Sequence, residues 1–356
     1  MSTLFNDTFL RACRKERVAH IPVWYMRQAG RYQADYRAIR EKYSFFEISR
    51  HPEVCAQVTR MPVDHLGVDA AILFADIMTP LKARGLDVSI IEGVGPVIKQ
   101  PFREEKDLQR LRLLEPMRDL PYVLETIDRL HDQLDVPLIG FAGAPFTLAS
   151  YLIEGGPSKN YHVTKAFMYT HPRLWQALMD DLAEMTIQYL SAQINAGAQA
   201  VQVFDSWVGS LSALDYSCYI APTMVRIFNA LRQTGAVTLY FSAGAGHLVQ
   251  EWTKLPVDVL SVDWRTDVAQ LNEAHVAQAI QGTLDPSLLL APWPLLQARA
   301  EQILQQLAER PGYIFNLGHG VFPDVEEDTL RRLTDYVHCY SVNGRSESVS
   351  KFEKGC

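Results

Sequence analysis

Eight short apolar or β-branched runs recur along the chain, and their spacing restricts the possible fold more than any other feature. The runs are HIPVWY (20–25), AAILFAD (70–76), PLIGFAG (137–143), AQAVQVFDS (198–206), VTLYFSAG (237–244), VDVLSVD (257–263), AIQGTLD (279–285) and YIFNLGHG (313–320). Each has the length of a buried strand. Segments with helical periodicity separate them. The clearest is 172–196, where Pro172 suits the first turn and Gly197 the C-terminal stop.

This alternation predicts right-handed βαβ units and a parallel sheet covered by helices on both faces, which is the α/β class. Eight units can close into a single-domain (β/α)8 TIM barrel. An open, doubly wound sheet remains the alternative, because periodicity does not report closure. The stretch 88–101 alternates around Glu92 and Gly93, which predicts a small β-hairpin inserted after the second strand. A last helix is expected over 324–340, where acidic residues favour its N-terminal end.

No linker or composition shift marks a second domain, so residues 1–340 are expected to form the barrel. Residues 341–356 are polar and Ser-rich, which predicts a disordered tail that ends in Cys356. The five cysteines are far apart and form no C-x-x-C, which is typical of a reduced, cytoplasmic protein. The longest uncharged run, 136–153, is interrupted by proline and glycine, and therefore predicts a strand and turn rather than a membrane span.

The charge of the chain is negative overall but locally positive. Lys and Arg total 34 and Asp and Glu 41, giving a net charge of −7. That balance argues against a general nucleic-acid or membrane-surface binder. Residues 1–50 nevertheless contain ten Lys or Arg and five Asp or Glu, a surplus of +5. The surplus indicates either a small anionic ligand held at one place or a solvated basic helix face.

The common cofactor motifs are absent. GAGHLV (244–249) has Val249 where a dinucleotide-binding loop needs its third glycine, and no phosphate-binding loop of the G-x-x-x-x-G-K-[ST] type occurs. H-E-x-x-H and G-x-S-x-G are also missing, and no histidine has a cysteine at H-x-C spacing. The sequence therefore predicts neither a nucleotide cofactor nor a metal.

Several of the runs end in a polar residue. These residues are Asp76, Ser206, Ser242, Asp263, Asp285 and His319. Ligands of α/β folds bind beyond the carboxyl ends of the strands, so these side chains are expected to converge at one mouth. Taken singly, an Asp or Ser at such a turn is more often a helix cap.

Four arginines follow the first run within fourteen residues of PVWYMRQAGRYQADYRAIR (22–40), namely Arg27, Arg31, Arg37 and Arg40. Guanidinium groups bind carboxylates with two hydrogen bonds and remain charged, so this stretch suits a multiply carboxylated ligand. A second stretch, GFAGAPFTLASYLIEGG (140–156), is built of small residues and bears Tyr151.

These two segments resemble the paired signature motifs of the uroporphyrinogen decarboxylase family. The similarity extends through ILFADIMTPL (72–81), QVFDSW (202–207), GAGH (244–247), TLDP (283–286) and FNLGHG (315–320), and covers about Asp7 to Tyr340. The resemblance implies a single (β/α)8 barrel that is homodimeric, cytoplasmic and free of cofactors. It also implies the family reaction of tetrapyrrole and haem biosynthesis, in which the four acetate side chains of uroporphyrinogen III lose CO2 to give coproporphyrinogen III.

The resemblance also implies the site residues. The expected substrate contacts are Arg27, Gln28, Ala29, Gly30, Arg31, Arg40, Phe46, Asp76, Tyr151, Phe204, Ser206 and His319. Phe46 and Phe204 are expected as apolar walls. The catalytic residues are expected to be Asp76, Arg27, Tyr151 and His319.

The chemistry explains why these residue types are needed. Protonation of the pyrrole ring makes it an electron sink for the departing CO2, which is work that a cofactor does in other enzymes. We expect Asp76 to stabilise the protonated ring. Arg27 is the favoured proton donor, although a guanidinium is a very weak acid, and His319 or a bound water are its rivals.

Two other functions remain open. A corrinoid-linked thiol methyltransferase of the same barrel superfamily would need zinc held by His and Cys, but the region of His247 reads GAGHLVQ, without a cysteine. A non-catalytic tetrapyrrole binder would need the arginines and a pocket but not Asp76.

Overall fold

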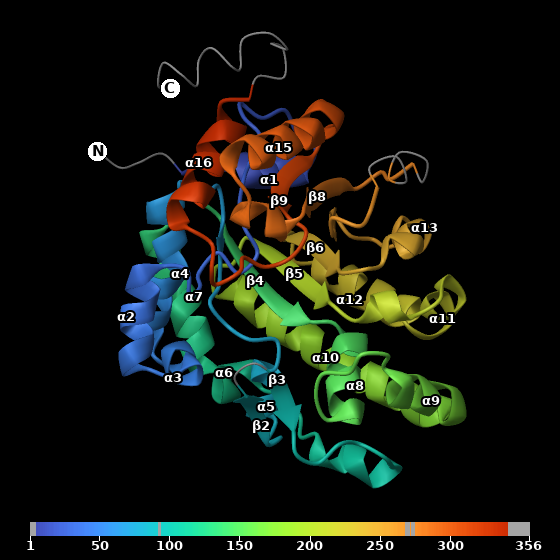
Figure 1. Cartoon of the computed structure of the whole chain (residues 1–356). Helices are drawn as coiled ribbons and strands as arrows, with labels where there is room; N and C mark the ends of the chain where they lie inside the picture. Colours follow the sequence, from blue (N-terminus) through green and yellow to red (C-terminus); the bar gives the residue numbers. More distant parts are fainter. Residues whose placement is uncertain (1–4, 92–93, 268–270, 272–274, 341–356) are drawn as a thin grey trace.

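Seven parallel strands form the main sheet of the protein. The computed structural model describes residues 5–91, 94–267, 271 and 275–340. The strands are β1 (Ala71–Ile72), β4 (Leu138–Gly143), β5 (Ala200–Asp205), β6 (Val237–Ser242), β7 (Val259–Val262), β8 (Ala279–Leu284) and β9 (Tyr313–Leu317). They lie in the order β1-β4-β5-β6-β7-β8-β9, so strands that follow one another along the chain are neighbours in space. Figure 1 shows that the sheet is curled and that its strands follow one another in the colour order of the sequence. This order confirms seven of the eight predicted strands.

The first predicted run fills the eighth position, but with less than a strand. Val23 forms an isolated parallel bridge with Phe315 of β9, and the Phe315 N–H donates to the Pro22 carbonyl over 2.9 Å. On the other side, the Asp69 N–H donates to the Val23 carbonyl over 2.7 Å. The segment therefore joins β9 to the approach of β1 and closes the barrel. It is short because Pro22 has no N–H to donate and because the Val23 N–H donates to the Asp69 side chain over 2.8 Å.

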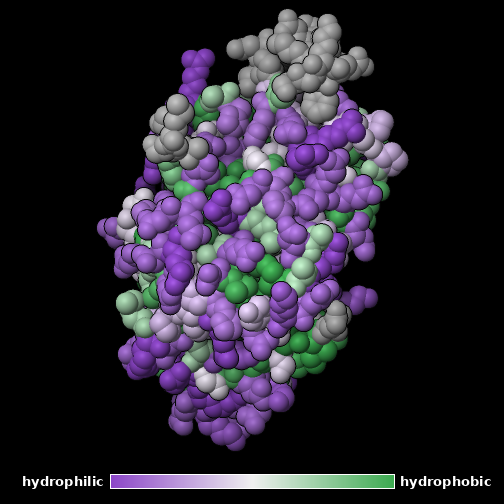
Figure 2. All heavy atoms as spheres, turned by 90° about the vertical axis from the view of Figure 1, so that its left-hand side faces the viewer, coloured by the Kyte–Doolittle hydropathy of each residue, from purple (hydrophilic) through white to green (hydrophobic). Residues whose placement is uncertain are grey.

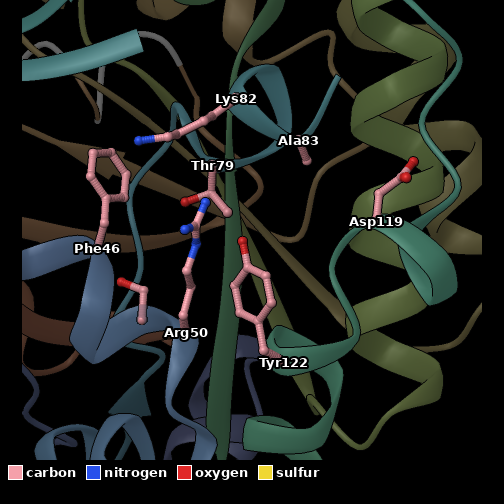
Figure 3. Close-up of a pocket in the computed structure, with 8 residues that line it drawn as sticks. Phe46, Arg50, Thr79, Lys82, Ala83, Asp119 and Tyr122 are labelled. Atoms are coloured by element: carbon pink, nitrogen blue, oxygen red, sulfur yellow. The ribbon is translucent and has the colours of Figure 1, made fainter. Parts of the chain in front are cut away.

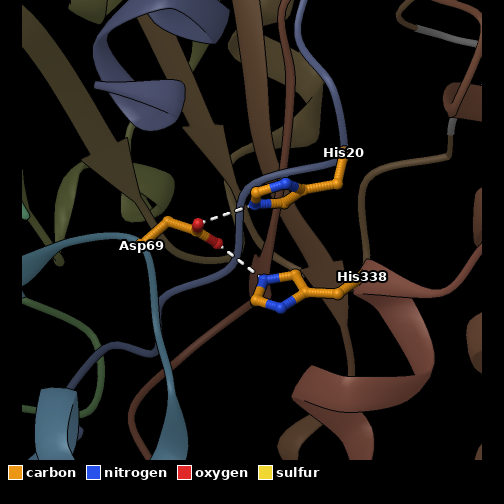
Figure 4. Close-up of side chains that lie close together, drawn as sticks. All are labelled: His20, Asp69 and His338. Carbon is orange, nitrogen blue, oxygen red and sulfur yellow. Dashed lines mark hydrogen bonds and ion pairs between the residues drawn. The ribbon is translucent and has the colours of Figure 1, made fainter. Parts of the chain in front are cut away.

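The buried Asp69 carboxylate holds this closure together (Figure 4). Besides Val23, it accepts hydrogen bonds from His20 at 2.7 Å, from His338 at 2.7 Å and from Asn6 at 3.0 Å. Burial alone would raise the pKa of Asp69, but the hydrogen bonds from the two histidines outweigh it and hold that pKa well below its usual range. The clasp thus joins the N-terminal segment, the entry to β1 and the last helix.

Helices surround the sheet (Figure 1). They are α1 (Thr8–Cys13), α2 (Ala34–Lys42), α3 (Phe45–Arg50), α4 (Pro52–Leu66), α5 (Thr79–Ala83), α6 (Pro116–Asp119), α7 (Pro121–Gln133), α8 (Pro145–Glu154), α9 (His162–Thr170), α10 (Pro172–Asn195), α11 (Ala213–Tyr219), α12 (Ala221–Arg232), α13 (Val249–Trp252), α15 (Trp293–Leu307) and α16 (Glu327–His338). Short 3-10 turns are η1 (Glu105–Arg110), η2 (Val208–Ser210), η3 (Gly246–Leu248) and η4 (Pro286–Leu290). Helices α4, α7, α8 and α10 each begin with a proline, whose missing N–H is not needed in the first turn.

Both helices predicted from periodicity are present. The expected helix over 172–196 is α10, which ends one residue earlier, at Asn195. The expected last helix, 324–340, is shorter than predicted because α16 begins only at Glu327 and ends at His338. Glu327 and Asp328 still lie in its first turn, where the helix dipole favours negative charge.

The predicted hairpin follows β1. Strands β2 (Val88–Ile91) and β3 (Gly95–Ile98) pair antiparallel as a separate two-stranded sheet. The Ile98 N–H donates to the Gly155 carbonyl over 2.8 Å, which anchors the hairpin beside the end of α8. Gly155 has a left-handed φ of 86°, and a side chain there would meet Pro101. The predicted tail, 341–356, and its Cys356 lie outside the described residues.

The surface shown in Figure 2 is mostly hydrophilic, with separate hydrophobic areas between the polar side chains. Among the described residues, no helix has the length and apolar character that a membrane crossing requires.

The clasp gives a first prediction. Asp69→Asn leaves His20 and His338 without a charged acceptor, and we expect it to lower the free energy of unfolding by about 3 kcal/mol near pH 6, measured by urea denaturation. The pKa of His20 is raised, chiefly by its hydrogen bond to Asp69. Its stabilising contribution is therefore complete below the unfolded pKa of about 6.5 and is lost as the pH rises through the raised value.

The difference in stability between wild type and Asp69→Asn should consequently shrink above neutral pH. Asp64→Asn, which removes an exposed carboxylate paired with Arg60, is the control. A loss of stability no larger than that of the control would show that the clasp does not hold the barrel closed.

Candidate active site

Asp76 lies just beyond the carboxyl end of β1, in the turn that leads to α5. Its Oδ1 accepts the Met78 N–H at 2.8 Å, and the Thr79 N–H donates to its carbonyl at 3.0 Å. Asp76 therefore also holds the turn that precedes α5, whose N-cap residue is Met78. Among the described residues, however, no hydrogen bond reaches the second carboxylate oxygen, and the residue is only partly buried. Burial raises the pKa of Asp76, while the Met78 N–H and the charge of Arg27 oppose that shift.

Arg27 projects from a strained loop that follows the closing segment. Its φ is 57°, a left-handed conformation that costs free energy for a residue other than glycine. The loop is held on both sides, because the Met26 N–H donates to the Asn316 side chain at 3.1 Å and the Val321 N–H donates to the Met26 carbonyl at 3.0 Å. The guanidinium-bearing side chain is exposed. The loop is therefore rigid where it presents its charge.

Gln28, expected as a substrate contact, braces this loop with its side chain. Its side chain is fully buried. The amide oxygen accepts the Tyr25 N–H at 3.0 Å, and the amide nitrogen donates to the Ala70 carbonyl at 3.0 Å. Sequence reasoning missed this role because the motif places Gln28 beside Arg27 without showing which way each side chain turns. Ala29 and Gly30, the next two residues, are partly exposed.

His319 and Gly320 follow β9 on the same side of the barrel as Arg27. A side chain at Gly320 would come within 2.4 Å of the Arg27 Cδ, so the arginine stem lies directly against this glycine. Burial and the neighbouring Arg27 lower the pKa of His319 to about 4, with Asp263 opposing the shift. The imidazole is therefore neutral near pH 7.

Tyr151 joins the same group from α8. Burial raises its pKa to about 12, and the charge of Asp76 adds to the shift while Arg27 opposes it. Its ring packs edge-on against Trp207, with the centroids 6.0 Å apart. The charge of Arg27 therefore acts on Asp76, Tyr151 and His319, which come from three different parts of the chain, and Asp76 acts on Tyr151.

Phe204, expected as an apolar wall, belongs to a chain of aromatic rings at the ends of three strands. Its ring centroid lies 5.3 Å from that of Phe141 and 5.6 Å from that of Phe241. Phe241 continues the row to His319 at 6.2 Å. The sequence analysis did not single out Phe141 or Phe241, although their place in two of the apolar runs was a signal.

The other expected contacts are more dispersed. Arg31 is exposed, whereas Arg40 is partly buried and donates to the Tyr43 carbonyl at 3.1 Å. Phe46 lies under the Lys82 ammonium, which is 3.7 Å from the ring centroid. Ser206 is partly exposed in the turn after β5.

Two of the predicted strand-end residues are structural. Asp285 accepts the Ser287 N–H at 2.9 Å and caps η4, which is the usual role of an Asp at such a turn. Asp263 is buried, pairs with Arg265 at 2.6 Å and accepts the Gly244 N–H at 2.7 Å. It therefore holds the GAGH turn in place rather than facing a ligand. Ser242 is also buried.

Asp205 is the residue that sequence reasoning overlooked. This fully buried carboxylate ends β5, directly before Ser206. It accepts hydrogen bonds from Thr147 at 2.8 Å and from Tyr240 at 2.7 Å. Thr147 in turn accepts the Trp207 N–H at 3.3 Å, so the network positions the turn that carries Ser206. Burial raises the pKa of Asp205 to about 6, and these hydrogen bonds limit the shift.

One group in the described part of the chain has the spacing of metal ligands, and it is the clasp of His20, Asp69 and His338. It lies before β1, whereas Asp76 follows that strand, so the two occupy opposite ends of the barrel. Both histidines already donate to the Asp69 carboxylate (Figure 4), and the group contains no cysteine. His247, where the methyltransferase alternative needs a ligand, contacts the Leu211 carbonyl at 2.8 Å instead.

Comparison with known proteins decides the family. The model of the family "Uroporphyrinogen decarboxylase (URO-D)" matches residues 4–340. The chain is 61% identical over 342 residues to "Uroporphyrinogen decarboxylase" of Geobacillus kaustophilus, which covers 96% of this chain and 99% of the relative. The corresponding protein of Halalkalibacterium halodurans is 58% identical over 343 residues and covers 96% and 100%. The chain belongs to the uroporphyrinogen decarboxylase family.

Solved structures of proteins with low sequence identity to this chain share its fold. A methyltransferase from Methanosarcina mazei superposes with a TM-score of 0.77 at 20% identity and covers 93% of this chain and 97% of its own. A B12-independent methionine synthase from Shewanella gives a TM-score of 0.56 at 10% identity, covering 80% and 87%. At these identities the likeness concerns the barrel alone.

The Asp205 network gives a second prediction. Because the folded pKa is raised above the unfolded value of about 3.9, the stabilisation associated with the protonated carboxyl is complete below that value and is lost as the pH rises through about 6. Wild type should therefore lose about 1 kcal/mol of unfolding free energy relative to Asp205→Asn between pH 5 and 8, measured by urea denaturation. A difference that does not change with pH would contradict the raised pKa.

Proposed function

We propose that this protein decarboxylates uroporphyrinogen III to coproporphyrinogen III as a carboxy-lyase of tetrapyrrole biosynthesis. The observation that carries the proposal is the electrostatic coupling of Asp76 to Arg27 and Tyr151 at one mouth, in a chain of the uroporphyrinogen decarboxylase family. A cation whose charge acts on a nearby anion suits a substrate that carries carboxylates and becomes positively charged during the reaction.

We assign the central electrostatic role to Asp76. The carboxylate oxygen that does not accept the Met78 N–H is available to accept hydrogen bonds from pyrrole N–H groups. Its negative charge would then stabilise the ring when a proton is added beside the acetate and CO2 departs. A preorganised charge of this kind contributes more in a partly buried site than in water, because no solvent must reorient around it. The aromatic row that includes Phe204 would supply the apolar wall.

We assign the proton donor to Arg27 in preference to His319. An acid must carry a proton near neutral pH, and the lowered pKa of His319, about 4, leaves its imidazole neutral there. His319 is then suited to hydrogen-bond a substrate carboxylate. A guanidinium remains a weak acid, so a water bound between Arg27 and the ring is the second candidate.

The deciding experiment is a reaction with the proposed substrate. The protein is incubated anaerobically with chemically reduced uroporphyrin, with and without a metal chelator, and the porphyrins are chromatographed after oxidation. We expect coproporphyrin in both samples. Loss of product only with the chelator would contradict decarboxylation without a metal. Unchanged uroporphyrin in both samples would favour a non-catalytic tetrapyrrole binder or the zinc-dependent methyltransferase.

Substitution of Asp76 tests the proposed mechanism. Asp76→Asn keeps the shape and an oxygen that can accept the Met78 N–H but removes the charge. We expect turnover to fall by about 100-fold or more, as is typical when one electrostatic partner of a transition state is lost. Asp76→Glu keeps the charge and should retain more activity. Equal turnover of the two variants, measured under saturating substrate, would remove Asp76 from this role.

The remaining expectations stay predictions. The resemblance predicts a homodimer in the cytoplasm, a reaction without cofactors and a barrel made by residues 1–340. Light scattering of the purified protein tests the dimer directly.

A further inference from the structure

A cavity of about 410 Å³ opens between α3, α5 and α7 (Figure 3). Its lining residues are Phe46, Ser49, Arg50, Thr79, Lys82, Ala83, Asp119 and Tyr122. Thr79 follows Asp76 by three positions along the chain and begins α5, the helix that also carries Lys82. Phe46, an expected substrate wall, forms one side.

Two cations face this space without an acidic partner. Within the described part of the chain, no ion pair includes Arg50 or Lys82. The nearby Asp87 pairs with Lys99 at 2.8 Å. Asp119 lines the cavity, but its carboxylate pairs with Arg118 at 3.1 Å and Arg112 at 3.4 Å. Figure 3 shows Asp119 apart from the group formed by Arg50, Thr79 and Tyr122.

Holding these cations together is unfavourable for the empty protein. Burial and the charge of Arg50 both lower the pKa of Lys82, while the charge of Asp87 opposes that shift. The folded structure nevertheless keeps both Arg50 and Lys82 at the cavity. Arg50 ends α3, whose start is fixed by a capping box between Ser44 and Glu47, and Lys82 lies over the Phe46 ring. Like charges maintained in a cavity are typical of a binding site for an anion.

The side chains that line the cavity suit a carboxylate in particular. Thr79 and Tyr122 supply hydroxyl donors, and Arg50 supplies a planar fork that matches the two oxygens of a carboxylate. Phe46 and Ala83 provide an apolar surface for a short aliphatic stem. The combination fits a carboxylate at the end of an alkyl chain.

We propose that the Arg50–Lys82 cavity is a carboxylate-binding subsite. Two sources of this group have the same chemistry. One is a peripheral carboxylate side chain of the tetrapyrrole, an assignment that rests on the proposed function. The other is a separate small dicarboxylate, which does not depend on it.

The test measures binding and kinetics with matched variants. Succinate is titrated into the protein by calorimetry, with sodium chloride of equal ionic strength as the blank. The variants are Arg50→Gln, Lys82→Met and the control Arg129→Gln. Arg129 lies on the same helix as Tyr122 but pairs with Glu125 at 2.9 Å outside the cavity, so the control removes the same charge. Unchanged thermal unfolding establishes that each variant is folded.

If the ligand is a separate dicarboxylate, succinate should bind wild type and the control, and about tenfold more weakly to both cavity variants, because each removes a charged hydrogen-bond donor. The KM for uroporphyrinogen should then be unchanged. If the carboxylate belongs to the substrate, both cavity variants should raise that KM severalfold at nearly constant kcat, and the control should not. No succinate binding together with wild-type KM in both cavity variants would overturn the subsite. Absence of turnover in wild type would refute the proposed function and leave the succinate titration to decide the subsite.

Discussion

The Asp69 carboxylate is the interaction on which closure of the barrel depends, because it binds the first segment, the entry to β1 and the last helix at once. A parallel sheet has no tight turn to join its first and last strands. Side chains must therefore hold the seam, which is the place where the segment around Val23 joins β9 to the approach of β1. Here the seam is weak in backbone terms, with only the bridge between Val23 and Phe315 on one side. Charge-assisted hydrogen bonds to a buried carboxylate compensate for the missing ladder.

The same seam sets the geometry of the mouth at its other end. The residues after Val23 run directly into the Arg27 loop, and Gln28 ties that loop to Ala70, at the start of β1. Asp76 leaves the opposite end of the same short strand. The strained arginine and the carboxylate therefore take their positions from one closed seam, and a shift in it would separate them.

Burial then gives the charged groups of the mouth different properties. The pKa of Asp76 is raised and that of His319 is lowered because both are partly withdrawn from water, and Arg27 reinforces the shift of the histidine. Asp205 shows the same effect without access to the mouth. Through Thr147, Asp205 positions the turn that contains Ser206 and Trp207. In the sequence, the expected contact residue Ser206 drew attention away from its neighbour Asp205.

The sequence by itself determined the alternation of strands and helices, the hairpin and α10, because hydrophobic periodicity and proline positions act locally. Periodicity left closure of the sheet open, and the resemblance of the arginine motif and its companions to the family implied the barrel. The sequence predicted a full first strand, since an apolar run does not reveal that Asp69 takes the Val23 N–H. Only the tertiary structure decided that Gln28 faces inward, that Asp205 is buried and that Arg50 and Lys82 share a cavity. The direction of a side chain, its burial and the charges that lie near it depend on how segments distant in the sequence pack together. The order of residues along the chain does not show that packing.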